Sequence, residues 1–216
     1  MHKKLKFLLT IFLFITIIFS AMITPTVARG TSSMQTYDED LLDMLSNITH
    51  IHSKFCQTLL NRQEGITKIS TGELWVSKPN FFKLQIKTPQ KQMLLYNQGK
   101  FWNYEEDLEQ VTISEVPKNI SNVPYLLILT GDIPTLKEFF NIEKVSENSY
   151  CLKSKAKDNS LITSININFA NKTLKSMLIQ TEVGQSTLIE FYDIYTSKIS
   201  TLIYQFTPPD GVDILD

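Results

Sequence analysis

The stretch Gly72–Gln85, with the sequence GELWVSKPNFFKLQ, decides the fold class of this chain. Beyond the turn at Lys78, apolar Phe82 and Leu84 alternate with polar residues, and this period of two predicts a β-strand with one buried face. The segment before the turn, which contains Trp75, predicts the partner strand of a hairpin. Large apolar side chains and one lysine therefore gather at one corner of a predicted sheet.

Similar strand patterns fill most of the remaining chain. A Gly-containing turn at 97–100 predicts a second hairpin, and Trp102 and Tyr104 share one face of its return strand. Further strands are expected near 93–95, 111–113, 150–152, 165–169, 174–180, 188–195 and 199–206. The pattern predicts a mainly β (α+β) protein in which roughly eleven strands, joined mostly by short turns, form an antiparallel meander. A sheet of this length curls and acquires a concave side.

Three segments are expected to be helical. Thr36 and Glu39 have the spacing of a capping box, and the apolar residues that follow predict an amphipathic helix over 37–49. The apolar run 123–130 and the segment 134–140 predict two shorter helices. The helices over 37–49 and 123–130 are apolar enough to cover the concave side of the sheet.

Two interpretations of the large apolar side chains remain open at this point. Trp75, Phe82, Trp102 and Tyr104 can belong to an ordinary core, which is the default for such residues. Alternatively, the helices form a lid over a ligand pocket that these side chains border. Periodicity alone does not distinguish a filled core from a covered pocket.

The first 28 residues have the pattern of a secretory signal peptide. Three lysines precede Phe7–Ile23, which contains no charge, and small residues follow at Thr26 and Ala28. We expect cleavage near Ala28, which leaves residues 29–216 as a single exported and soluble domain. An uncleaved membrane anchor is the alternative, because the apolar run approaches the length that spans a bilayer.

The composition of the exported part argues against nucleic-acid binding. Removing three lysines from 21 basic residues, against 22 acidic residues, leaves a formal charge of −4 with scattered signs. Binding to nucleic acid would require a clustered basic face. Cys56 and Cys151 can pair in an oxidising compartment or remain as two buried thiols, and the sequence leaves both possibilities open.

Residue patterns typical of enzymes are scarce. His50 and His52, expected at the end of the first helix, have no acidic or cysteine residues at a spacing that predicts a metal site. Cys56 follows shortly after His52, which makes a Cys/His nucleophile conceivable without supporting it. The sequence also lacks a phosphate loop, a nucleophile elbow and a dinucleotide fingerprint. We therefore expect a protein that is not an enzyme and that has no metal or other cofactor.

Four segments in one order resemble the LolA family of periplasmic outer-membrane lipoprotein carriers. They are GELWVSKPNFF at Gly72–Phe82, NQGKFWNY at Asn97–Tyr104 with LEQ beyond it at Leu108–Gln110, VPYLLI at Val123–Ile128 and FTPPDGVD at Phe206–Asp213. Each segment alone is a weak signal, whereas the set in register is fairly specific. The likeness extends from about Leu41 to Asp213, which is nearly the whole exported chain.

The resemblance implies an unclosed antiparallel β-barrel in which helices form a lid over a hydrophobic cavity. It implies a periplasmic chaperone that accepts acylated lipoproteins from the inner-membrane ABC transporter LolCDE and passes them to the outer-membrane receptor LolB. We expect this chaperone to be a monomer. The residues expected to line or rim the cavity are Trp75, Phe82, Leu84, Trp102 and Tyr104, and those expected from the lid are Leu45, Tyr125 and Ile128.

Lys78 departs from the family pattern, which has arginine at this position and uses it to latch the lid through backbone carbonyls of the lid helices. A lysine keeps the charge but lacks the planar fork of donors, so the strength of the latch is in doubt. The alternative for Lys78 is a solvated turn residue.

Two other classes of function remain as alternatives. The same half-barrel occurs in periplasmic regulators that sense lipid or lipoprotein, which a second domain or a retained anchor would indicate. A lipid-modifying enzyme comes third, and it would require a carboxylate, histidine or cysteine in the cavity.

Overall fold

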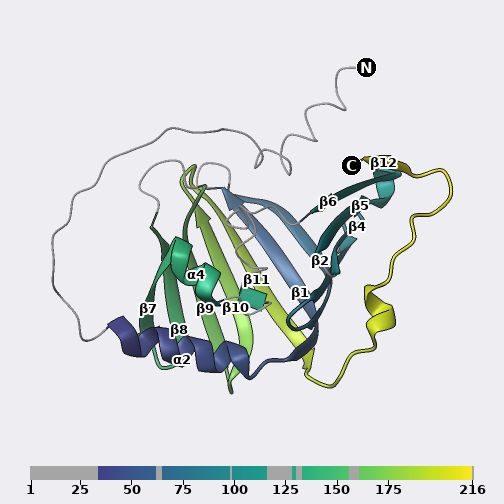
Figure 1. Cartoon of the computed structure of the whole chain (residues 1–216). Helices are drawn as coiled ribbons and strands as arrows, with labels where there is room; N and C mark the ends of the chain where they lie inside the picture. Colours follow the sequence, from purple (N-terminus) through teal and green to yellow (C-terminus); the bar gives the residue numbers. More distant parts are fainter. Residues whose placement is uncertain are drawn as a thin grey trace, which may run out of the picture. The chain divides into compact units, whose positions relative to one another are not determined.

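Twelve strands form one sheet in the computed structural model, which describes residues 34–61, 65–97, 99–115, 128–129, 133–155 and 161–215 (Figure 1). Their bounds are β1 His50–Asn61, β2 Gly65–Ser77, β3 Phe81–Thr88, β4 Gln92–Asn97, β5 Lys100–Glu105, β6 Gln110–Glu115, β7 Phe140–Ser146, β8 Ser149–Ser154, β9 Ile162–Ala170, β10 Thr173–Thr181, β11 Gln185–Tyr195 and β12 Asp213–Leu215. The hairpin predicted around the turn at 78–80 is β2–β3, and the hairpin predicted around the turn at 97–100 is β4–β5.

The sheet consists of two antiparallel meanders, β1–β6 and β7–β11, which join where β1 pairs with β11. The complete order is β12-β6-β5-β4-β3-β2-β1-β11-β10-β9-β8-β7, so β12 and β7 are the two edges. These edges do not pair with each other, and the sheet is therefore unclosed. Among the described strands, only the short β12 runs parallel to its neighbour, β6. The predicted mainly β, unclosed antiparallel architecture is confirmed.

Besides Ile128 and Leu129, the described part of the chain contains two α-helices and two short 3-10 helices. They are α2 Met34–Ser46, α4 Ile133–Phe139, η1 Glu106–Leu108 and η3 Thr201–Tyr204. Within the described part of the chain, neither α-helix is long and apolar enough to cross a membrane. The segment predicted as a helix over 134–140 is α4, and Ile128 and Leu129 are also helical. The signal peptide and Tyr125 lie outside the described residues.

The first helix differs from its prediction at both ends. Because α2 begins at Met34, Thr36 lies inside the helix and is not its N-cap. The helix ends at Ser46, where the side chains of Ser46 and Asn47 both donate hydrogen bonds to the Asp43 carbonyl. The Asn47 backbone N–H also donates to this carbonyl, at 3.2 Å, so three donors meet one acceptor in the last turn, and the helix ends earlier than its apolar pattern suggests.

Alternation along the strands divides the apolar residues between the two faces of the sheet. We call the face that carries the larger buried cluster the inner face. This inner cluster contains Leu41, Leu45 and Ile48 from α2 and the turn after it, together with side chains from β1–β3 and β7–β11. A second cluster, the outer cluster, lies on the opposite face and consists of Met93, Leu95 and Tyr204, with Trp75, Phe81, Trp102, Tyr104, Ile199, Ile203 and Phe206 packed against it.

Gly72 allows close packing at the centre of the inner face. It pairs with Phe55 across β1 and β2. A Cβ atom at this position would lie 2.0 Å from the Gln85 carbonyl oxygen and 2.8 Å from the Phe55 ring. The absent side chain therefore makes room for the aromatic ring of the neighbouring strand.

Four strand predictions require correction. The segment 199–206, predicted as a strand, contains η3 and covers the outer cluster. The strands β1, β7 and β12 were not predicted. In β1 the alternation of apolar residues is interrupted, because Ser53 occupies the inner-face position between Ile51 and Phe55. His50 and His52 were expected at the end of the first helix. They lie instead at the start of β1, one on each side of Ile51.

Candidate functional site

The inner cluster brings together four of the residues that the sequence singled out. Leu45 comes from α2, Phe82 and Leu84 come from β3, and Ile128 comes from the short helical segment. Leu45, Phe82 and Ile128 are almost completely buried, and Leu84 is 8% exposed. A helix and the sheet thus enclose these side chains between them.

The buried side chains of this cluster are apolar, apart from one tyrosine hydroxyl. Its buried members are leucine, isoleucine, valine, phenylalanine, methionine and one tyrosine. Side chains of this kind exclude water and adapt to flexible hydrocarbon, but they do not polarise a substrate or transfer protons. Within the described residues, the inner cluster therefore supports binding of apolar chains better than catalysis.

Lys78 connects the β2–β3 turn to the last turn of α2. Its side-chain ammonium donates a hydrogen bond to the carbonyl oxygen of Leu45. Its backbone N–H donates to the Thr49 carbonyl at 2.9 Å, which fixes the turn beside the end of the helix. A cation at the C-terminus of a helix interacts favourably with the helix dipole. Burial opposes the charge and lowers the pKa of Lys78 to about 8.

A second lysine holds the other half of α2. The Lys144 ammonium on β7 pairs with the Asp40 carboxylate, and this hydrogen bond raises the pKa of Lys144. Because the lysine and the aspartate are both partly exposed, the pair adds little stability by itself. Packing of Leu41 and Leu45 accounts for most of the attachment of α2, and two separable polar contacts, made by Lys78 and Lys144, fix its position.

Trp75, Trp102 and Tyr104 do not belong to the inner face, contrary to the expectation that they border the same cavity as Phe82. The reason is strand register, because Val76 pairs with Phe82 and the adjacent Trp75 pairs with Lys83. The side chains of neighbouring residues in a strand point to opposite faces. All three aromatic residues pack against the outer cluster.

The C-terminal segment covers this outer cluster. The Phe206 ring meets Trp102 edge-on, with ring centroids 6.0 Å apart, and lies 5.2 Å from the Tyr104 ring. The buried Tyr204 stacks on Phe81, and its hydroxyl lies 2.8 Å from the Ser77 hydroxyl. Each of these aromatic side chains thus has a packing role that is separate from the inner face.

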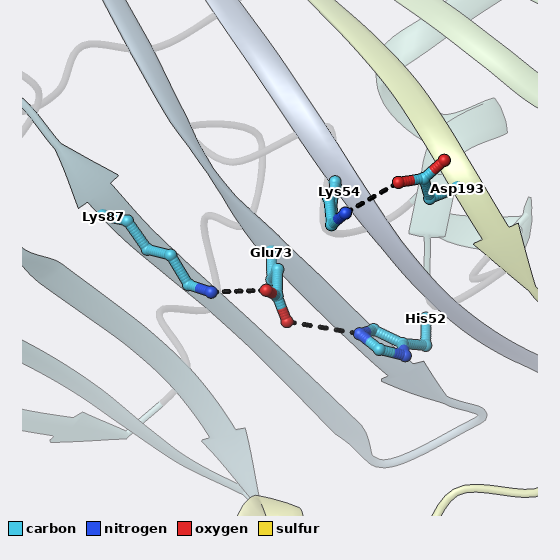
Figure 2. Close-up of polar contacts among 5 residues, drawn as sticks. All are labelled: His52, Lys54, Glu73, Lys87 and Asp193. Carbon is cyan, nitrogen blue, oxygen red and sulfur yellow. Dashed lines mark hydrogen bonds and ion pairs between the residues drawn. The ribbon is translucent and has the colours of Figure 1, made fainter.

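Polar residues on the outer face of β1–β3 and β11 form ion pairs (Figure 2). Glu73 lies between His52, at 3.3 Å, and Lys87, whose hydrogen bond lowers the pKa of the glutamate. Lys54 pairs with Asp193 at 2.8 Å. His52 also stacks on Trp75, with ring centroids 5.0 Å apart. These contacts give His52 a structural environment on the outer face of the sheet.

The remaining candidates for reactive groups also have ordinary environments. His50 Nδ1 lies 3.0 Å from the Ser77 hydroxyl. Cys56 and Cys151 are free thiols on β1 and β8, and three strands, β11, β10 and β9, separate them in the sheet. Burial raises the pKa of the Cys151 thiol, which makes this thiol less nucleophilic at neutral pH.

Sequence reasoning missed several members of the inner cluster, among them Phe55 and Tyr150. Phe55 belongs to β1, where Ser53 interrupts the alternation of apolar residues. The apolar residues Ile51 and Phe55 of β1, four positions apart with Ser53 midway, were the available signal, because they lie on one face of a strand.

Comparison with known proteins places the chain in a family. Residues 46–207 match the model described as outer membrane lipoprotein carrier protein LolA. The outer-membrane lipoprotein carrier protein of Francisella philomiragia is 34% identical over 181 residues, which cover 82% of this chain and 87% of that protein. The corresponding protein of Hahella chejuensis is 30% identical over 181 residues, which cover 81% of this chain and 86% of that protein.

Comparison with solved structures supports the fold of this chain and nothing further. The MucA/MucB complex of Pseudomonas aeruginosa matches with a TM-score of 0.50 and 13% identity, over 79% of this chain and 61% of that chain. The family resemblance inferred from the four sequence segments is confirmed by the family model and by the relatives. This chain belongs to the LolA family of outer membrane lipoprotein carrier proteins.

Proposed function

We propose that this protein is a periplasmic chaperone that shields the acyl chains of lipoproteins and carries them between two membranes. The observation that carries the proposal is the inner cluster, an apolar layer on one face of an unclosed sheet with α2 packed over it. An unclosed sheet can widen without breaking a ring of strand pairs, which a closed barrel cannot do.

The free energy of hiding hydrocarbon explains why such a carrier is needed. At about 0.8 kcal/mol per buried CH₂, shielding a 16-carbon chain is worth roughly 12 kcal/mol. An acylated protein would therefore stay in a membrane unless another apolar surface received its chains. The inner face can supply this surface once the side chains of α2 move out of the inner cluster.

The attachment of α2 suits a reversible lid. Leu41 and Leu45 fill the inner cluster in the closed form, and Lys78 and Lys144 hold the helix at two points. An acyl chain that displaces these leucines replaces one set of apolar contacts with another, so loading has a small net cost. When the cargo leaves, closure of the lid restores the original contacts and favours release.

The proposed sites of contact with acyl chains are Leu45, Phe82, Leu84 and Ile128, and Tyr125 is proposed as a further lid residue. The proposed partners are LolCDE as donor and LolB as acceptor, with the carrier acting as a monomer. The reaction is a transfer by binding and release, in which no covalent bond changes.

Copurification tests this proposal. The protein is purified from the periplasm, and mass spectrometry identifies what accompanies it. We expect triacylated lipoproteins, and we expect the same lipoproteins to be absent when the cysteine that carries their lipid is replaced. Equal recovery of acylated and unacylated forms would show that the protein does not recognise the acyl chains.

The same measurement gives the mature N-terminus. If residues 1–28 are a signal peptide, the purified protein begins at or near Arg29. An intact Met1 on the periplasmic protein would show that the segment is retained.

A further inference from the structure

Two side-chain hydroxyls on the inner face are buried without a hydrogen-bond partner. Within the described chain, Ser53 Oγ and Tyr150 Oη are the only buried side-chain nitrogen or oxygen atoms of this kind. Both side chains are fully buried. A buried polar group without a partner is destabilising, and nearly all such groups in proteins are paired. Each of these two hydroxyls therefore requires an explanation.

Tyr150 has an explanation in packing. It is one of the largest fully buried side chains, and its ring meets Phe169 edge-on with centroids 6.1 Å apart. The Lys144 ammonium lies 6.0 Å from the centre of the same ring. The aromatic body of Tyr150 fills the inner cluster beside β7, and this apolar contact can offset an unpaired hydroxyl.

Ser53 has no such explanation. A serine contributes almost no apolar surface, yet it occupies an inner-face position between Ile51 and Phe55, both members of the inner cluster. On β2 its partner in the ladder is Leu74, another member. An alanine or valine at this position would suit the closed, unloaded protein better, so packing does not account for the hydroxyl.

The backbone around Ser53 is also irregular. His52 pairs with Tyr195 and Lys54 pairs with Tyr192, so one residue of β1 lies opposite two residues of β11. Asp193, in this bulge, has a left-handed φ of 51°. Bulges re-aim the side chains near them and are frequent beside binding sites. The irregular pairing of β1 and β11 thus coincides with the one inner-face position of β1 that carries a small polar group between two apolar residues.

We propose that the Ser53 hydroxyl donates a hydrogen bond to the carbonyl oxygen of an acyl ester in the bound lipid. This inference rests on the proposed carrier function and specifies a contact within it. The hydrocarbon of an acyl chain has no acceptor, and its ester carbonyl is the acceptor nearest to the apolar part. In a dry environment a hydroxyl and a carbonyl satisfy each other without water.

The position of Ser53 suits the polar end of a lipid. The Ser53–Leu74 pair lies three ladder positions from the His50–Ser77 pair, which is about 10 Å along the strands. Lys78 follows Ser77 and holds the end of α2. A carbonyl at Ser53 therefore leaves the lipid head close to the edge where the lid is latched, and the chain can extend over Phe55.

The test compares two synthetic lipopeptides that differ only in these carbonyls. Both carry two 16-carbon chains on a glyceryl-cysteine with a free amino group, one set linked by esters and the other by ethers. Affinity is measured by displacement of an apolar dye from the full exported protein. A neutral hydrogen bond of typical strength predicts that the wild type prefers the ester by about three- to tenfold.

The variants Ser53→Ala and Tyr150→Phe form a matched pair, because each removes one buried, unpaired hydroxyl and little else. We expect Ser53→Ala to bind the two lipopeptides equally and Tyr150→Phe to keep the wild-type preference. Ser53→Ala should also unfold at the same or a higher urea concentration than the wild type. A merely structural role of Ser53 would lower that concentration and leave the ester preference unchanged.

The outcomes separate this inference from the carrier function. Equal binding of both lipopeptides by the wild type, retention of the preference in Ser53→Ala, or its loss in Tyr150→Phe would each overturn the role of Ser53 and leave the carrier function intact. Failure of the wild type to bind either lipopeptide, while it still binds the dye, would overturn the carrier function and this inference together.

Discussion

The Lys78 ammonium donates a hydrogen bond to the backbone carbonyl of Leu45 and so joins the β2–β3 turn to the end of α2. Leu45 is also a fully buried member of the inner cluster. One residue of the helix is therefore held through its side chain by packing and through its backbone by a lysine. If α2 is a lid, the release of Leu45 must break both contacts at once.

Substitution of Lys78 should change the balance between open and closed lids. A hydrogen bond from a charged group contributes about 1.5–3 kcal/mol at best, and less where water competes. We expect Lys78→Leu to favour the open form and to accumulate loaded carrier. Lys78→Arg, with five donors in a fixed fork, should favour the closed form and ease release.

The measurement for Lys78 is transfer of a labelled lipoprotein to the receptor, together with the fraction of carrier that stays loaded. Lys144→Leu is a useful comparison, because it removes the contact with the other half of α2. If the wild type and both Lys78 variants transfer equally, the hydrogen bond from Lys78 to Leu45 does not control the lid, and packing alone closes it.

The lowered pKa of Lys78 predicts a dependence of stability on pH. In the folded state burial lowers this pKa to about 8, whereas an exposed lysine has a pKa of 10.5. Between these values the unfolded chain binds more protons than the folded one, so raising the pH stabilises the fold. We expect the free energy of unfolding of the wild type, relative to Lys78→Met, to increase as pH rises from about 8 towards 10.5.

The comparison with Lys78→Met is needed because other groups titrate in the same range. Burial raises the pKa values of Cys151, Tyr150 and Tyr204, and these groups destabilise the fold at high pH in both proteins. Denaturant unfolding at several pH values gives the difference directly. A difference that does not vary between pH 7 and 10 would mean that Lys78 is not desolvated in the folded protein.

Replacement of Gly72 should destabilise the centre of the sheet. An alanine Cβ there would overlap the Gln85 carbonyl and the Phe55 ring, and forced overpacking of this kind costs about 1–3 kcal/mol or more. Gly99→Ala is the control, because Gly99 has open space around it but a left-handed φ of +94°, which costs about 1–2 kcal/mol. We expect urea unfolding to show the larger loss for Gly72→Ala, and a smaller loss there would contradict the close contact with Phe55.

The outer cluster should respond to mutation independently of acyl binding. Phe206→Ala removes a ring that packs against Trp102 and Tyr104. Trp102 is one of two tryptophans in the chain, so we expect its fluorescence to shift to longer wavelength as water reaches it. Affinity for an acylated lipopeptide should stay the same, because these rings lie on the face opposite the inner cluster. Leu202→Ala, at a side chain that is 69% exposed, should change neither property.

A strong loss of lipopeptide affinity in Phe206→Ala, without loss of folded protein, would return Trp102 and Tyr104 to the binding surface. The C-terminal segment would then be part of the acyl site.

The sequence predicted the sheet well because its turns and its alternation are local. Phe82 and Leu84 mark one strand without information from elsewhere in the chain, and Gly99 marks the neighbouring hairpin. Which side chains of a strand face a cavity depends on how that strand pairs with other strands, and the local sequence does not show this pairing. Trp75 and Phe82 are both large and apolar, and only the pairing of Val76 with Phe82 shows that they point in opposite directions.

Long-range contacts explain the other differences. The segment 199–206 has enough apolar residues for a strand, but the rings of Tyr204 and Phe206 pack over aromatic rings on β3 and β5 instead. β1 was hidden because Ser53 interrupts its apolar face. The position of Lys78 beside Leu45, by contrast, followed from the family resemblance, since no local pattern relates a turn lysine to a helix carbonyl 33 residues earlier.

Photocrosslinking from two adjacent residues tests the proposed acyl-binding face most directly. Phe82 points into the inner cluster, and Phe81 packs on the outer cluster beside Tyr204. Each is replaced in turn by a photoreactive benzoyl-phenylalanine, and the loaded carrier is irradiated. We expect the acyl chains of the lipoprotein to crosslink at position 82 and not at position 81. Crosslinking at 81 alone, or equally at both positions, would contradict the claim that the inner face beneath α2 carries the lipid.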